Sequence, residues 1–323
     1  GLESMKPEKN ADGYYLIGSP EALAWFAYKV NTDNTNYRTA KALLTADIDL
    51  AGLNFTKELS VNSDFSNCLQ WIPIGNAPSD SSMITTLSYR GIFDGGNCEI
   101  KNLYIVGGAF HTGFFGAVNS ATIRNVKIMS GSVTGTDRVA GIVAIANSGI
   151  VTIENCYNAA DVKSVLLSGG VACNTGGIVG GTLGPVTGSS AQLIVKNCVN
   201  KGAISGYREV GGIIGRINPS GRAEIQNCYN LGSIIQSGTN HNEFGYGGIV
   251  GSADGKASTI SNCYNVGTVN KPFDAKEIAS AELEAMMARE RESTVELSPV
   301  GDFAERGVQE EENLEAIALV LYK

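Results

Sequence analysis

A short motif recurs through the middle of this chain, and its recurrence constrains the fold more than any other feature of the sequence. One copy, Gly247-Gly248-Ile249-Val250-Gly251, is followed eleven residues later by Asn262-Cys263-Tyr264-Asn265-Val266-Gly267. Three more copies pair a Gly-Ile segment at 177, 212 or 141 with an Asn-Cys segment at 197, 227 or 155, and a looser copy pairs Gly113-Phe114-Phe115-Gly116 with Asn125-Val126. Repetition at such a period is typical of a repeat architecture.

The distances between the copies indicate a parallel β-helix. Measured at the Asn, positions 102, 125, 155, 197, 227 and 262 give spacings of 23, 30, 42, 30 and 35 residues. A coil of 23 residues has room for three short strands and three turns, so we expect three strands in each coil and surface insertions in the longer coils. Stacked coils place equivalent residues about 4.8 Å apart, which would align Ile, Val and Cys in inner ladders. The usual hand of parallel crossovers predicts right-handed winding.

The residue types of the motif have structural explanations. Gly and Asn tolerate positive φ, and Asn side chains bond to nearby backbone, so both suit corners between strands. The Cys position is occupied by Leu103 and Val126 in outer copies, which favours an apolar core position over the alternative of a disulfide or a metal ligand. Four equivalent Asn residues are expected to pair amide to amide along the helix: Asn155, Asn197, Asn227 and Asn262.

The composition divides the chain into three segments. Residues 1–99 hold an amphipathic helix at about 20–31, opened by Ser19 and Pro20, and are predicted to be an N-terminal cap with leader coils. Residues 100–273 are predicted to be the repeat β-helix. Residues 274–323 contain 13 acidic and 5 basic residues, which predicts a helical acidic tail with an apolar stripe at Leu314, Ile317, Ala318 and Leu321. The predicted fold class is all-β, a right-handed parallel β-helix whose exposed strand edges are covered by helical end caps.

Charge and hydropathy exclude several partners. Residues 1–273 carry 19 acidic and 19 basic residues, so the net charge of -8 comes from the last fifty residues. A nucleic-acid binder needs a basic footprint, and none is present, so no nucleic-acid partner is predicted. No run of 18 apolar residues occurs, so no membrane-spanning segment is predicted.

The sequence assigns no catalytic residue, metal site or cofactor. It lacks a G-x-S-x-G elbow, a G-x-G-x-x-G turn and a P-loop, and its two histidines, His111 and His241, cannot supply a familiar triad or zinc site. Carboxylates do not recur in pairs at one repeat phase, which disfavours a carbohydrate-active enzyme without excluding it. Asp47 and Asp49 could hold a cation on one strand face, but a structural role is favoured.

The repeated Gly-x-x-Gly followed by Asn-Cys-Tyr-Asn-x-Gly-x-Val resembles the GLUG motif of bacterial surface proteins, over roughly residues 100–270. That motif occurs in adhesin-like proteins and in non-catalytic regions of immunoglobulin A peptidases. The resemblance implies an exported protein at the cell surface or outside the cell, with a lipid anchor through a segment beyond this sequence as one option. The peptidases also carry a zinc-binding H-E-x-x-H helix, which this sequence lacks.

Variable segments before the Gly-x-x-Gly strands provide a candidate binding edge. Stacking of the coils would align these loops, and their aromatic and charged residues suit ligand binding. The candidate residues are Arg138, Tyr207, Arg208, Glu209, His241, Glu243, Phe244 and Tyr246. The leading hypothesis is therefore a non-catalytic adhesion or host-interaction module that binds a host glycan or protein. The alternatives are a carbohydrate-active β-helix enzyme and a passive spacer that displays another domain.

Overall fold

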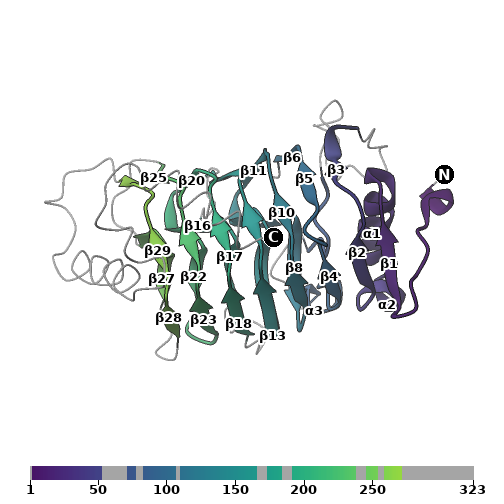
Figure 1. Cartoon of the computed structure of the whole chain (residues 1–323). Coiled ribbons are helices and arrows are strands. Elements are labelled where there is room, and N and C mark those ends of the chain that lie inside the picture. The colour runs from purple at the N-terminus through teal and green to yellow at the C-terminus, as the bar shows by residue number, and fades with distance from the viewer. Residues whose placement is uncertain are drawn as a thin grey trace, which may run out of the picture.

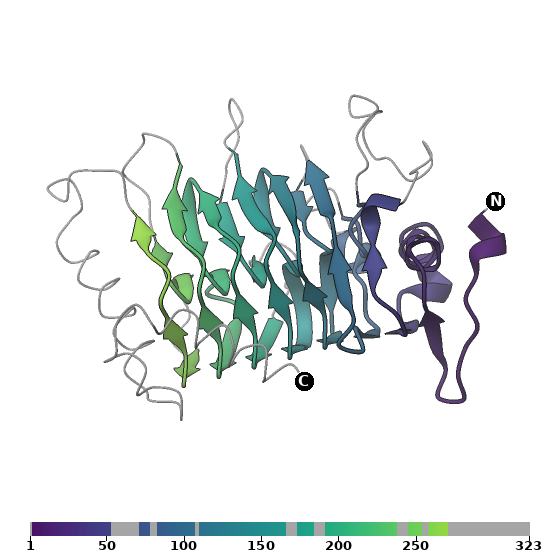
Figure 2. The same cartoon turned by 45° about the horizontal axis from the view of Figure 1, so that its top comes forward.

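The chain forms an elongated stack of coils with helices near its N-terminus (Figure 1; Figure 2). The computed structural model describes residues 2–52, 71–77, 83–106, 110–165, 173–183, 191–237, 245–253 and 258–270. The predicted tail at 274–323 lies outside the described residues. The helices are η1 (Leu2–Met5), α1 (Pro20–Thr32), α2 (Asn34–Tyr37), η2 (Leu50–Gly52) and α3 (Ile84–Leu87).

In the described part of the chain, four sheets run along the stack, and the strands within each pair in parallel. The 12-stranded sheet contains β1 (Tyr14–Ile17), β2 (Lys41–Leu44), β4 (Ile92–Asp94), β8 (Phe115–Asn119), β9 (Thr122–Arg124), β13 (Val143–Glu154), β17 (Val179–Thr182), β18 (Ala191–Lys196), β22 (Ile214–Ile217), β23 (Arg222–Gln226), β27 (Val250–Ala253) and β28 (Thr259–Ser261). The 7-stranded sheet contains β3 (Ile48–Asp49), β5 (Glu99–Lys101), β10 (Lys127–Ile128), β14 (Tyr157–Asn158), β19 (Val199–Asn200), β24 (Tyr229–Asn230) and β29 (Tyr264–Asn265).

The two remaining sheets follow in chain order within each coil. The 6-stranded sheet contains β6 (Leu103–Val106), β11 (Gly131–Gly135), β15 (Asp161–Ser164), β20 (Ile204–Gly206), β25 (Ile234–Gln236) and β30 (Val269–Asn270). The 5-stranded sheet contains β7 (Phe110–Thr112), β12 (Asp137–Ala140), β16 (Cys173–Gly176), β21 (Arg208–Gly211) and β26 (Tyr246–Gly247). This mostly-β, parallel architecture is β-helix-like, as the repeats predict.

Between β4 and β27 each coil has five strands, so the prediction of three strands was wrong. One turn runs through β18, β19, β20, β21 and β22, and β23 then returns beside β18. Register partners in successive coils are Asp94, Arg124, Glu154, Lys196, Gln226 and Ser261, which gives coil lengths of 30, 30, 42, 30 and 35 residues. No described coil has 23 residues.

The error came from treating Asn102 as the equivalent of Asn125. Asn125 lies between β9 and β10, at the corner that leads into the 7-stranded sheet, whereas Asn102 lies one corner later, between β5 and β6. Both residues have left-handed backbone, with φ of 56° and 60°. The same local conformation at two different corners therefore produced a spurious short spacing.

The interior is built from ladders of apolar side chains, as the repeats predict. Register partners from β4, β9, β13, β18 and β23 are all 0 % exposed: Phe93, Ile123, Ile153, Val195 and Ile225. The cysteines of the motif form a second ladder, and each thiol donates to a backbone carbonyl of its own coil over 3.3–3.4 Å: Cys156, Cys198, Cys228 and Cys263. These four thiols are free and buried, which confirms the core position. Val126 fills the same position, but Leu103 lies in the 6-stranded sheet.

The first Asn of each motif turns the corner between the 12-stranded and 7-stranded sheets. Asn125, Asn155, Asn197, Asn227 and Asn262 all have φ between 51° and 56°. The side-chain amides of Asn155, Asn197 and Asn227 each donate to the Asn of the preceding coil, over 3.2–3.3 Å. These bonds confirm the predicted amide ladder from Asn155 to Asn227, and they satisfy side chains that are only partly exposed.

The second Asn of the motif forms a buried ladder that the sequence analysis did not predict. Asn158 donates to Asn200 over 3.0 Å, Asn200 to Asn230 over 2.8 Å, and Asn230 to Asn265 over 2.8 Å. Space for these amides depends on the first Gly of each Gly-x-x-Gly segment. A Cβ on Gly212 would lie 2.3 Å from the Asn230 amide carbon.

Aromatic packing joins α1 to the first coils. Ser19 accepts a hydrogen bond from the Ala22 amide, and Pro20 occupies the first turn, so the predicted helix forms at Pro20–Thr32. Phe26 lies on the buried face of α1 and contacts Phe93 and Tyr89, with ring centroids 6.0 Å apart in both pairs. The helix therefore shares one continuous core with the strands.

Candidate functional site

The predicted binding edge lies where the 6-stranded sheet turns into the 5-stranded sheet. In the 5-stranded sheet, four residues of successive coils are register partners: Val139, Thr175, Val210 and Tyr246. The residues that immediately precede them therefore stack along the edge. Each of these preceding residues has left-handed backbone, and so does His111, which precedes their register partner Thr112. The φ angles are 63° for His111, 54° for Arg138, 58° for Asn174, 57° for Glu209 and 73° for Gly245. We call these five residues the left-handed row.

The left-handed row explains the last Gly of the Gly-x-x-Gly segment. A Cβ on Gly215 would lie 2.5 Å from the Thr175 amide and 2.7 Å from the Asn174 carbonyl carbon. A Cβ on Gly251 would lie 2.8 Å from the Glu209 carbonyl carbon. The turn of the row thus approaches the next strand so closely that a side chain there would clash.

An exposed aromatic ring meets a cation at the N-terminal part of the edge. Phe110 is 37 % exposed, and the guanidinium carbon of Arg138 lies 5.9 Å from its ring centroid. Arg138 also pairs with the adjacent carboxylate of Asp137, which keeps the guanidinium oriented. A ring face and an arginine held side by side can contact a sugar ring or an aromatic side chain.

Polar side chains continue along the row. Glu209 and Arg216 form an ion pair at 2.9 Å, and their side chains are 6 % and 27 % exposed. His111 Nδ1 lies 2.6 Å from the Ala77 carbonyl oxygen, so that nitrogen must donate the hydrogen bond. The side-chain oxygen of Asn174 is buried without a hydrogen-bond partner.

The structure brings four of the other predicted residues to this edge, with different exposures. Tyr207 and Arg208 are partly exposed. Glu209 and Tyr246 are buried, and the Tyr246 hydroxyl donates to the Tyr207 carbonyl oxygen. Burial raises the pKa of Tyr246, so its hydroxyl stays protonated at neutral pH. Tyr246 therefore fixes the loop, and its ring is not available at the surface.

Three predicted residues, His241, Glu243 and Phe244, lie outside the described residues. Sequence reasoning missed Phe110, Asn174 and Arg216, although all three contribute to the edge. Their residue types differ from coil to coil, so no repeated letter marks the position. The one signal available was that Asn174, like Arg138 and Glu209, stands three residues before the first Gly of a Gly-Ile segment.

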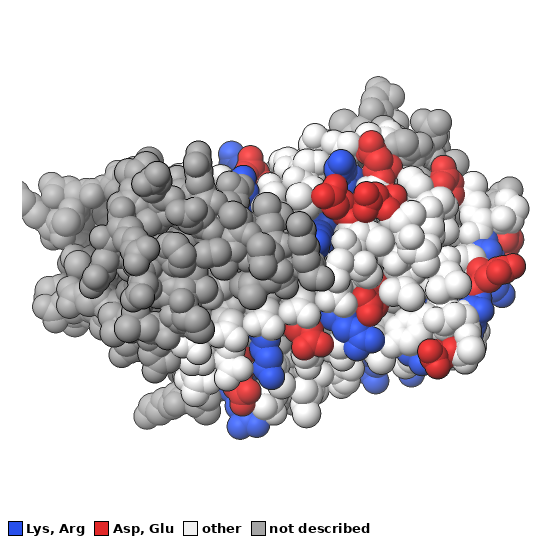
Figure 3. All heavy atoms as spheres, viewed as in Figure 1, with Lys and Arg blue, Asp and Glu red and all other residues white. Residues whose placement is uncertain are grey.

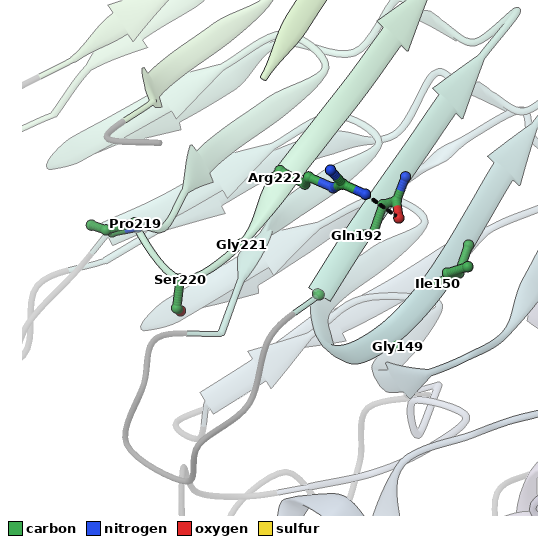
Figure 4. Close-up of a pocket in the computed structure, with 8 residues that line it drawn as sticks. Gly149, Ile150, Gln192, Pro219, Ser220, Gly221 and Arg222 are labelled. Atoms are coloured by element: carbon green, nitrogen blue, oxygen red, sulfur yellow. Dashed lines mark hydrogen bonds between the residues drawn. The ribbon is translucent and has the colours of Figure 1, made fainter. Parts of the chain in front are cut away.

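A shallow hollow of 460 Å³ lies at another corner, where β17 and β22 lead back into β18 and β23 (Figure 4). Its wall combines the 59 % exposed side chain of Ile150 with Gln192, Arg222 and the turn at 219–221. Arg222 donates to the Gln192 side-chain oxygen over 2.8 Å (Figure 4). The hollow has no buried polar side chain at its base, so the edge remains the better candidate site.

The surface electrostatics agree with the even charge of residues 1–273. Figure 3 shows charges of both signs scattered over the described part of one face, with most of that surface uncharged. Asp47 accepts from the Glu99 amide, and Asp49 accepts from Asn102 and from the Ala51 amide. These bonds give both carboxylates the structural role that was favoured. In the described part of the chain, no group of three His, Cys, Asp or Glu residues is arranged to hold a metal ion.

Comparison with known proteins gives one similarity in fold. No protein-family model matches the chain, and no curated protein matches it. The chain is similar to the crystal structure of a putative immunoglobulin A1 protease from Bacteroides ovatus, with a TM-score of 0.55 and 21 % sequence identity. The match covers 85 % of this chain and 83 % of that one. Among the described helices, none is both long and apolar enough to cross a membrane.

Proposed function

We propose that this chain is a non-catalytic binding module of a bacterial surface protein, used in adhesion or interaction with a host. The observation that carries the proposal is the edge itself. Successive coils hold their left-handed residues in register, and this arrangement places Phe110, Arg138, Tyr207 and Arg208 along one side of the stack. A rigid scaffold that presents variable aromatic and charged residues is a common basis for recognition.

The ligand we propose is a host glycan or a host protein. Phe110 offers a ring face, and Arg138 offers donors that its pairing with Asp137 holds in place. The similarity in fold to a putative immunoglobulin A1 protease makes immunoglobulin A1 the first protein to test as a ligand.

We also propose the family, the handedness and the domain boundaries of the chain. The chain is a GLUG-motif protein with a right-handed winding, in which α1 caps the N-terminal end and residues 1–99, 100–273 and 274–323 act as cap, repeat body and tail. The buried Phe26 and Trp25 of α1 support the cap. Export to the cell surface or outside the cell follows from the resemblance of the motif.

The test is a binding screen with two matched variants. The purified chain is applied to a glycan array and to immobilised immunoglobulin A1. Phe110→Ala removes the exposed ring, and Arg138→Ala removes the guanidinium beside it, whose side chain is 13 % exposed. Each should weaken binding at least about tenfold if the pair is a recognition hot spot. Lys163→Ala serves as the control, because Lys163 is exposed on the 6-stranded sheet. Tyr246→Ala is unsuitable, because loss of the buried ring would destabilise the loop.

Three results would contradict the proposal. Equal loss of binding in Lys163→Ala would place the contact elsewhere on the surface. Depolymerisation of a bound glycan would favour the carbohydrate-active enzyme. An absence of binding to every glycan and to immunoglobulin A1 would favour the passive spacer.

A further inference from the structure

The 7-stranded sheet carries an apolar row on its outer face. Cys156 belongs to the core, and Asn158 is buried against Gly141, so Tyr157 between them faces outward. Its register partners along the sheet are Val199, Tyr229 and Tyr264. We call these four residues the outer tyrosine row.

The outer tyrosine row is apolar only toward the C-terminal end of the stack. In the two preceding coils the same position holds Lys127 and Glu99. The next outward position is similarly apolar, with Met129, Ala159, Leu231 and Val266 packed against the row. Outward positions on a sheet that faces water are ordinarily polar, so this change indicates a covered surface.

The exposed fractions show that this outer face is covered. Tyr157 and Tyr229 are each 4 % exposed, Val199 is 1 % exposed and Tyr264 is 9 % exposed. The row forms a cluster separate from the core. No described hydrophobic residue outside the row and the position beside it belongs to this cluster.

We propose that the acidic C-terminal segment, residues 274–323, binds along the outer tyrosine row. The segment follows β30, which lies one strand after Tyr264 in the last coil. The segments 166–172, 184–190, 238–244 and 254–257 are less suitable, because they connect strands at corners away from the 7-stranded sheet. The C-terminal segment also has an apolar stripe of its own at Leu314, Ile317, Ala318 and Leu321.

Charge supports the same occupant. The segment has 13 acidic and 5 basic residues. Lys127 continues the row, and Lys201 lies beside it, between the positions of Ala159 and Leu231. An acidic segment therefore meets lysines at the margin of an apolar surface, and salt is expected to weaken its attachment.

The proposal is tested by acetylating tyrosines with N-acetylimidazole in the full chain and locating the products by mass spectrometry. Tyr104 is 47 % exposed and serves as the reactive reference, and Tyr89, at 0 %, serves as the core reference. Tyr157, Tyr229 and Tyr264 should react at least about tenfold more slowly than Tyr104, because reaction requires local opening. Burial also raises the pKa of Tyr157, which delays its ionisation in a spectroscopic titration.

A double variant of the tail, Ile317→Asp with Leu321→Asp, should release the segment. The three row tyrosines should then approach the reactivity of Tyr104, while Tyr89 remains protected and shows that the stack is still folded. The matched control is Ile235→Asp, which places the same charge on an exposed outer position of β25. It should leave the row protected.

Three results would overturn the proposal. Continued protection of the row tyrosines in the tail variant would show that another segment covers them. Reactivity equal to that of Tyr104 in the unaltered chain would show that nothing covers the row. Protection that disappears on dilution of the unaltered chain would assign the cover to a second copy of the protein.

Discussion

Removal of one amide from the buried Asn ladder should destabilise the whole stack. In Asn200→Ala, three hydrogen bonds are lost: Nδ2 donates to the Gly202 carbonyl over 2.9 Å and to Asn230 over 2.8 Å, and Oδ1 accepts from Asn158 over 3.0 Å. Asn158, Asn200 and Asn230 are all 0 % exposed, so water cannot replace the lost partner without entering the interior.

The magnitude follows from the number of bonds and the burial of the neighbours. Each hydrogen bond contributes about 1 kcal/mol net, which gives about 3 kcal/mol for three bonds. The substitution also leaves one amide hydrogen of Asn158 without its acceptor, and a buried unsatisfied group costs about 1–3 kcal/mol. The Asn230 side-chain oxygen still accepts a hydrogen bond from the Gly232 amide. We therefore expect a loss of about 4–6 kcal/mol in the free energy of unfolding.

Urea unfolding followed by far-ultraviolet circular dichroism measures this loss. The control is Gln192→Ala in the same coil, which removes an exposed hydrogen bond to Arg222 and should cost less than about 0.5 kcal/mol. The double variant Asn200→Ala with Asn230→Ala should cost less than the sum of the single variants by at least about 1 kcal/mol, because partners in one network are coupled. A cost below about 1 kcal/mol for Asn200→Ala, or strict additivity, would refute the reasoning.

Three further predictions concern the corners and the first coils. At Asn227, where φ is 53°, the variant Asn227→Gly should be about 1 kcal/mol more stable than Asn227→Ala in urea unfolding. Both variants lose the side-chain hydrogen bond to Asn197, but only Ala strains the left-handed backbone. Gly212→Ala should cost about 1–3 kcal/mol or more by the same assay, because its Cβ would lie 2.1 Å from a backbone carbonyl oxygen. Although burial opposes it, hydrogen bonding from Asn125 and neighbouring groups lowers the pKa of Asp94. The ionised Asp94 carboxylate therefore stabilises the folded state at pH values above its ordinary pKa, and this stabilisation is lost as the pH falls through the lowered pKa of the folded state. Asp94→Asn should accordingly reduce the loss of unfolding free energy at acid pH, measured by urea unfolding at a series of pH values.

The sequence correctly predicted the structural positions of those residues whose type recurs from coil to coil. The Cys of the motif was placed in the core, where Cys198 and Cys228 are 0 % exposed. The first Asn was placed at a corner, where Asn197 and Asn227 both have φ of 53°. In each case, comparison among copies separated structure from chemistry, because only a shared structural requirement keeps one residue type at one position of successive coils.

The strand count failed because two corners were read as the interior of single strands. The segment at 259–264 contains β28, the left-handed corner at Asn262 and β29, and the Gly-x-x-Gly segment at 247–251 contains the end of β26 and the start of β27. The five strands of a coil were therefore counted as three. The buried ladder of Asn158 and its equivalents was missed for another reason, because its packing against a Gly of the preceding coil depends on the winding of the chain.

The coils differ in length at some corners between strands and keep the same length at others. Two residues separate β9 from β10, β18 from β19 and β28 from β29, because the left-handed Asn and the core residue after it fill that corner. At the binding edge, one residue separates β20 from β21, but eight separate β15 from β16 and nine separate β25 from β26. The strands on either side keep their register despite these insertions. The fold can therefore change its loops at the binding edge without repacking its interior, and residues that set ligand preference are expected there and not in the repeated motif.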